Sequence, residues 1–354
     1  MPYNDVQQMM LLAYAADTEL TKLTGDDTAD AQTLATALTG TVLPAINSGA
    51  GTNWTLSWGP YVKTEPFSFG WANMHWYPSL EYRIVNTMFM ATDGNRTCIA
   101  IAGTDFRSLY DWLFEDLSVL ELKPWSDLYP QTKAPASAMV SDAMHKGFSN
   151  LQNATPATTI LGAGTTMTDV LNGITASGSE VYVTGHSLGG ALAPIVSLWI
   201  ADQQASQGLY PNFTVNPFSY AGPTPGEANF QKYYGNVLPN TQRVWNRLDI
   251  VPNAWNQTTL GQIQFAYNNM PQSPTVHIQP DSIENAALTK AAQVGGSHGY
   301  VSVIPGAAPL PGASFDLTQP SFASEVFYQH INSYPLLLGV PAPPVIADVP
   351  SGGM

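Results

Sequence analysis

The amino-acid sequence predicts an α/β fold with a mostly parallel central sheet and helices on both of its faces. An apolar run at 181–183 leads through a glycine-flanked turn into an alanine- and leucine-rich segment, which is typical of a strand followed by a helix. Two β-like runs, 82–91 and 97–102, are separated by the turn-forming tripeptide Asp93-Gly94-Asn95 and predict a hairpin. After this hairpin, strand-like and helix-like segments alternate, as they do in sheets whose strands run parallel.

The N-terminal part of the chain predicts two helices and an aromatic cover. The helices are expected at 4–16 and 28–39, and the capping candidates Asp26 and Asp27 precede the second. Residues 50–80 are rich in Trp, Tyr, Phe, Gly and Pro and follow no clear period. We expect irregular or short-stranded structure there, with its aromatic side chains packed rather than binding a ligand.

The remaining elements follow from periodicity and from glycine and proline content. Helices are expected at 139–153, 165–175, 188–201 and 325–338, strands at 214–221 and 242–248, and a long surface loop at 294–313. The alternation supports one domain over residues 1–338, followed by a Pro- and Gly-rich tail at 339–354.

Charge and composition exclude some classes of partner. The 354 residues include 12 Lys and Arg against 26 Asp and Glu, a formal net charge of −14. Such a surface repels nucleic acid and anionic membranes, whereas neutral esters and neutral lipid surfaces remain open. No apolar run is long enough to predict a transmembrane helix. The single cysteine, Cys98, lies in a predicted strand and is expected to be a small core residue.

The cellular compartment stays open at this point. The apolar run 9–16 has no Lys or Arg before it and is not expected to be a signal peptide. Few charges, with many Asn, Thr, Gly and aromatic residues, favour a secreted protein.

The turn Gly185-His186-Ser187-Leu188-Gly189 carries the first chemical hypothesis. A serine hydroxyl becomes a useful nucleophile when a strained turn lifts it clear of the backbone and a base accepts its proton. Glycines on both sides permit such a turn, because a Cβ there would collide with neighbouring backbone. The Leu188 N–H, at the start of the following helix, is a candidate donor to a developing oxyanion.

A nucleophilic serine needs a histidine base and an acid that orients it. Asp249 follows the predicted strand 242–248, at the end of a parallel strand where such folds place their chemistry. In α/β-hydrolases the acid follows the serine along the chain and the histidine follows the acid. His277, His298 and His330 satisfy this order, and the order leaves all three open.

Several motifs in the same order resemble the class 3, fungal-type lipases, which have the α/β-hydrolase fold. The resembling segments are Ile101-Ala102-Gly103-Thr104, Asp111-Trp112-Leu113, Asp116-Leu117, His145-Lys146-Gly147-Phe148, Gly185–Gly190, Ala221–Gly226 with Phe230, and Arg247–Pro252. His330 with Tyr334 is similar to the terminal histidine segment of that family. One departure is Ala102, which stands where the family usually has an arginine.

This resemblance implies a serine-dependent carboxylic ester hydrolase, most readily a triacylglycerol lipase. It implies Ser187 as nucleophile, Asp249 as acid and the N–H groups of Thr104 and Leu188 as the oxyanion hole. His330, 81 residues after Asp249, is the favoured base, whereas His298 has a spacing nearer that of simpler members. His145 and His186 are expected to be packing residues.

The resemblance also implies a lid after Thr104, for which the apolar segment 105–130 is the candidate. It implies no metal or organic cofactor. An esterase or a phospholipase A1 acting on polar esters would use the same residues, and a non-catalytic scaffold would share the fold.

Overall fold

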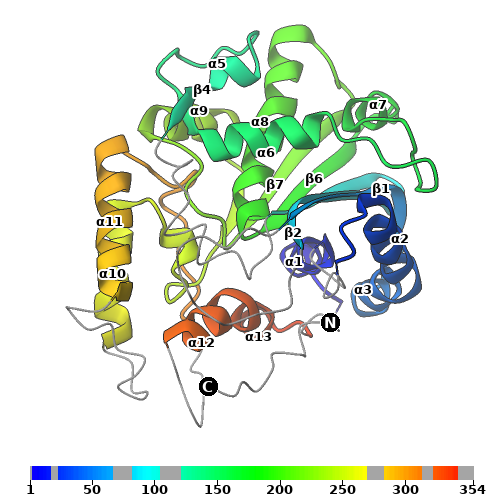
Figure 1. Cartoon of the computed structure of the whole chain (residues 1–354). Helices are drawn as coiled ribbons and strands as arrows, with labels where there is room; N and C mark the ends of the chain where they lie inside the picture. The colour runs from blue at the N-terminus through cyan, green and yellow to red at the C-terminus, as the bar shows by residue number, and fades with distance from the viewer. Residues whose placement is uncertain are drawn as a thin grey trace.

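The computed structural model describes residues 2–16, 23–66, 82–103, 121–268, 283–312 and 322–341 (Figure 1). Within these ranges a six-stranded sheet has the order β1-β2-β3-β6-β7-β8. Its strands are β1 (Thr55–Pro66), β2 (Tyr82–Thr92), β3 (Arg96–Ala102), β6 (Ser179–His186), β7 (Phe213–Tyr220) and β8 (Gln242–Val244). The pairs β1/β2 and β2/β3 are antiparallel, and the following three pairs are parallel. The predicted hairpin and the mostly parallel sheet are confirmed.

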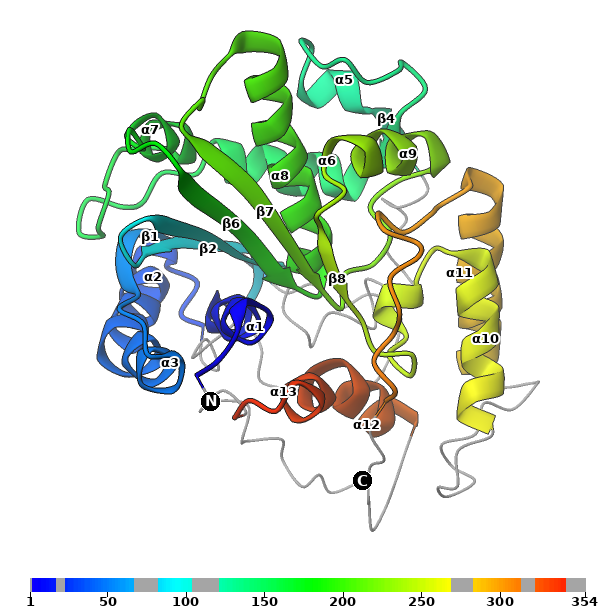
Figure 2. The same ribbon diagram turned by 180° about the vertical axis from the view of Figure 1, so that it is seen from behind.

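Helices cover both faces of this sheet, as predicted. One face carries α6 (Asp142–Gln152), α7 (Met167–Asn172), α8 (Leu188–Gln207) and α9 (Ala228–Val237). The other face carries α1 (Asp5–Ala16), α2 (Asp27–Ala37), the π-helix η1 (Leu38–Val42) and α3 (Leu43–Ala50). On this face too lies the C-terminal helical segment, made of α12 (Phe322–Phe327), the π-helix η6 (Tyr328–Asn332) and α13 (Ser333–Leu338) (Figure 2).

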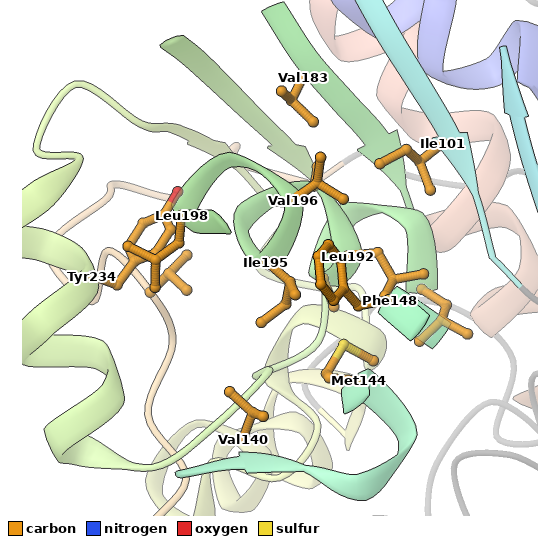
Figure 3. Close-up of a cluster of buried hydrophobic side chains, with 14 of the residues drawn as sticks. Ile101, Val140, Met144, Phe148, Val183, Leu192, Ile195, Val196, Leu198 and Tyr234 are labelled. Atoms are coloured by element: carbon orange, nitrogen blue, oxygen red, sulfur yellow. The ribbon is translucent and has the colours of Figure 1, made fainter. Parts of the chain in front are cut away.

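The two faces differ in side-chain size. On β3, Ile101 points toward α8 and lies in the larger apolar core with Leu192 and Phe148 (Figure 3). Ile99 belongs to the same core. Cys98, Ala100 and Ala102, which alternate with them, face α1. The small side chains let α1 approach the sheet closely, and every residue from Met9 to Ala16 is buried.

Burial confirms the prediction for Cys98. It is a free, fully buried cysteine, and burial raises the pKa of its thiol far above the ordinary value. The thiolate is the reactive form of cysteine, so Cys98 is a packing residue.

Four predicted segments need correction. Residues 50–80 are not merely short-stranded, because β1 runs over 12 residues at 55–66. The helix expected at 139–153 begins at 142, after the short strand β5 (Met139–Ser141). The strand expected at 242–248 ends at 244. Residues 294–298 of the expected loop 294–313 form the end of helix α11 (Ile283–His298).

The structure describes four further elements besides the sheet and the helices already given. They are β4 (Leu122–Pro124), α5 (Trp125–Leu128), the 3₁₀ turn η4 (Val251–Asn253) and α10 (Gln257–Asn268). Helices α10 and α11 lie side by side as a helical pair (Figures 1 and 2). No helix in the described part of the chain is both long and apolar enough to cross a membrane.

Candidate active site

Ser187 lies in a strained turn between β6 and α8. Its φ of 59° and ψ of −128° are unusual for a residue with a side chain, and its N–H donates to the Tyr220 carbonyl at 3.0 Å. The glycines around it permit close backbone packing. A Cβ on Gly185 would overlap the carbonyl of Gly189, and one on Gly189 would overlap the carbonyl oxygen of Ile101. The predicted need for glycine on both sides of Ser187 is confirmed.

We expect Gly189→Ala to destabilise the protein because its methyl group has no space between α8 and β3. Overpacking of this kind lowers the free energy of unfolding by about 1–3 kcal/mol. Urea unfolding measures the change, and Gly40→Ala is the matched control. Gly40 is also helical, but a Cβ there meets nothing within 4 Å. Equal stability of the two variants would contradict the packing argument.

Ser187, His330 and Asp249 form a continuous hydrogen-bonded series. The Ser187 Oγ lies 2.9 Å from His330 Nε2, and His330 Nδ1 lies 2.8 Å from Asp249 Oδ2. Ser187 is 7% exposed, whereas His330 and Asp249 are 0% exposed. The three residues are separated by up to 143 positions in the sequence, and the fold brings them together beside the end of β6, which stops at His186.

Asp249 is held by donors from its own turn and from the last helix. Its Oδ1 accepts from the Val251 N–H at 3.0 Å, and its Oδ2 accepts from the Tyr334 hydroxyl at 2.8 Å. Burial, and then the charge of Asp249, raise the pKa of Tyr334 well above the ordinary value, so its hydroxyl stays a donor. The Asp249 oxygens are therefore occupied by donors in a fixed arrangement, which orients His330.

Asn246 connects the Asp249 turn to the helix of His330. Its backbone N–H donates to the Tyr334 hydroxyl at 3.0 Å, and its side-chain amide donates to Gln329 Oε1 at 2.7 Å. Its side-chain oxygen accepts from the Leu248 N–H at 3.0 Å. Sequence analysis did not identify Asn246 as a site residue. Its signal is weak, because a polar residue three positions before an acid is common in any turn.

The structure distinguishes the three candidate bases. His330 occupies the place beside Ser187. His298 ends α11, and the contacts described for it are with the Ser297 hydroxyl at 2.9 Å and the Tyr300 ring. His277 lies outside the described residues. Of the two histidines expected to pack, His145 is half-buried on α6, and His186 is buried directly against His330.

One of the two candidate oxyanion donors can be placed. Leu188 is the first residue of α8, so its N–H has no acceptor within the helix and lies beside Ser187. A Cβ on Gly103 would overlap the Leu188 side chain, so the end of β3 is packed against this turn. Thr104 follows Gly103 but lies outside the described residues. Leu188 thus lies next to Ser187 at the start of α8, and its role as an oxyanion donor stays a prediction.

Only the last part of the candidate lid 105–130 is described. In residues 121–130, Trp125 is fully buried and its indole N–H donates to Asp202 of α8 at 2.8 Å. This part is packed on the domain. Residues 105–120 lie outside the described ranges, and the lid there stays a prediction. Among the described residues, no group of three or more His, Cys, Asp or Glu side chains could hold a metal ion.

Comparisons with known proteins give matches to lipases. Residues 98–259 match the family model "Lipase (class 3)". The lipase ZK262.3 of Caenorhabditis elegans is 36% identical over 73 residues, a match that spans 21% of this chain and 20% of the worm protein. The crystal structure of M37 lipase covers 95% of this chain and 93% of its own, with 26% identity and a TM-score of 0.78.

These comparisons account for both the fold and the segments that form the site. The matched region 98–259 contains β3, the Ser187 turn and Asp249, and the M37 match extends over the described elements on both faces of the sheet. The chain has the α/β-hydrolase fold, and its residues 98–259 are similar to the class 3 lipases, a family of carboxylic ester hydrolases.

Proposed function

We propose that this protein is a triacylglycerol lipase that works through an acyl-enzyme on Ser187, with His330 as base and Asp249 as the acid that orients it. The observation that carries the proposal is the buried hydrogen-bonded series from Ser187 Oγ through both nitrogens of His330 to Asp249. A histidine that donates from Nδ1 to a carboxylate has its Nε2 free to accept the serine proton.

In the first step, Ser187 Oγ attacks the ester carbonyl carbon and His330 Nε2 takes its proton. The negative charge moves to the carbonyl oxygen, which the Leu188 N–H and, as we propose, the Thr104 N–H stabilise. His330 then gives the proton to the leaving alcohol oxygen as its bond to carbon breaks. Water repeats the sequence on the acyl-enzyme, and the fatty acid leaves with Ser187 restored.

Two observations support a neutral lipid as substrate. The net charge of −14 disfavours anionic surfaces, and the segment 105–130 after the oxyanion strand is rich in apolar residues. A lipase and an esterase use the same catalytic groups. They differ in whether the rate rises when the substrate forms a lipid–water interface. Phospholipase A1 activity would appear as release of the sn-1 acyl chain from phosphatidylcholine.

Tributyrin hydrolysis across the solubility limit tests the substrate class. We expect the rate to rise sharply when droplets form, and Ser187→Ala to show no activity at any concentration. A rate that saturates smoothly below the limit would identify an esterase instead. If the wild type and Ser187→Ala were both folded and both inactive on every ester, the protein would be a non-catalytic scaffold with a hydrolase fold.

A further inference from the structure

The C-terminal helical segment changes its hydrogen-bonding pattern at His330. Residues 328–332 form a π-helix between two α-helical segments. Pro335 follows in α13 and has no N–H. In an α-helix that N–H would donate to the Ile331 carbonyl, and in a π-helix it would donate to the His330 carbonyl. Because of Pro335, the helix has one backbone donor fewer for the carbonyls of His330 and Ile331.

Two side chains from outside this segment donate to these carbonyls. The Tyr14 hydroxyl on α1 donates to the Ile331 carbonyl at 2.6 Å. His186 Nε2 lies 2.9 Å from the His330 carbonyl oxygen. A carbonyl oxygen only accepts, so His186 carries its proton on Nε2. Tyr14 and His186 thus supply side-chain donors to two neighbouring carbonyls, where Pro335 removes one helix donor.

His186 contacts His330 in a second way. Its ring is stacked on the Tyr14 ring at 4.6 Å and lies 4.7 Å from the His330 ring. All three side chains are buried, with exposures of 2%, 1% and 0% for Tyr14, His186 and His330. The three rings lie close enough to restrict the movement of His330 within the core.

His186 is suited to this place because it stays uncharged. Burial, and then the neighbouring His330, hold the pKa of His186 well below its usual value. Its Nδ1 is buried and has no hydrogen-bond partner among the described residues. A neutral ring beside His330 adds no charge that would oppose protonation of the base during the reaction.

We propose that His186 is a positioning residue for His330: adjacent residues of one strained turn hold the base at two points, His186 at its backbone carbonyl and Ser187 at its ring. This rests on the proposed function, in which His330 takes the Ser187 proton. Because β6 and α8 fix the turn, the bond to the carbonyl sets where the ring of His330 lies relative to Ser187 Oγ. Misplacement of reacting groups by about 1 Å costs about 100-fold in rate.

Steady-state kinetics on p-nitrophenyl butyrate test the proposal with two variants of His186. His186→Phe keeps a ring but cannot donate, whereas His186→Gln loses the ring and places an amide N–H near the position of Nε2. We expect His186→Phe to lower kcat by about 10- to 100-fold with KM unchanged. We expect His186→Gln to recover most of this loss.

Tyr182→Phe is the matched control, because Tyr182 also lies on β6 and its hydroxyl contacts Asp5 on α1 and Glu180, away from the C-terminal segment. Titration with a serine-reactive phosphonate counts folded sites in each variant. If His186→Phe does not fold, Tyr14→Phe, which loses the donor to Ile331 but keeps the ring, is expected to lower kcat in its place.

Wild-type kcat in both His186 variants, or an equal loss in both, would overturn the positioning role. Ser187→Ala in the same assay separates this from a failure of the proposed function. If Ser187→Ala retains activity, the function is wrong, whereas if only the His186 variants are unaffected, only the present inference is wrong.

Discussion

Ser187→Ala is expected to lower kcat for ester hydrolysis by about 10⁵-fold or more while leaving the fold intact. Without Oγ no acyl-enzyme forms, and His330 loses the group 2.9 Å from its Nε2. Removing the nucleophile of a serine hydrolase costs about as much as removing its whole triad, because these residues act as a unit. Initial rates on p-nitrophenyl butyrate, with protein concentration from active-site titration of the wild type, measure the loss.

Ser197→Ala is the matched control for this prediction. Ser197 lies on α8, the helix that follows Ser187, and is also buried, but its hydroxyl donates within the helix to the Ala193 carbonyl at 2.7 Å. This control separates loss of the nucleophile from loss of a buried hydroxyl. We expect it to keep the wild-type kcat. Activity of Ser187→Ala within tenfold of that control would exclude Ser187 as the nucleophile.

The parts of the fold that could be predicted are those that depend on local constraints. Gly185 and Gly189 are dictated by backbone contacts on either side of Ser187, so they are visible in a short stretch of sequence. The order of Ser187, Asp249 and His330 along the chain is the order of these residue types in α/β-hydrolases. These constraints act within a turn or between neighbouring strands.

The elements that sequence analysis missed depend on distant contacts. Strand β1 has register shifts at Leu56/Trp58, Trp58/Tyr61 and Lys63/Thr64, which remove the two-residue period that identifies a strand. Gly295 suggested a loop, yet it lies in helix α11. This position requires glycine for a different reason, because a Cβ there would overlap the Trp255 carbonyl. The Tyr14 bond to Ile331 joins residues 317 positions apart, and no local pattern indicates such a contact.

Asp249→Asn is expected to lower kcat by about 10⁴-fold, because an amide cannot satisfy the donors around this side chain. Both Asp249 oxygens accept: Oδ1 from the Val251 N–H, and Oδ2 from Tyr334 and His330. An amide NH₂ at the Oδ1 position would face the Val251 donor. At the Oδ2 position it would donate to His330 Nδ1 and leave the proton on Nε2, where the ring can no longer accept from Ser187.

The control for this substitution is a second buried carboxylate that accepts from several side chains but lies away from Ser187. Asp202 accepts from Trp125 Nε1, Thr132 and Tyr233, so Asp202→Asn also places an amide among donors. We expect Asp202→Asn to lower the thermal midpoint and to keep kcat per folded molecule, whereas Asp249→Asn lowers kcat in molecules that remain folded. Since a general loss of stability would affect the two variants alike, an equal kcat in both would show that Asp249 supports the fold and does not orient the base.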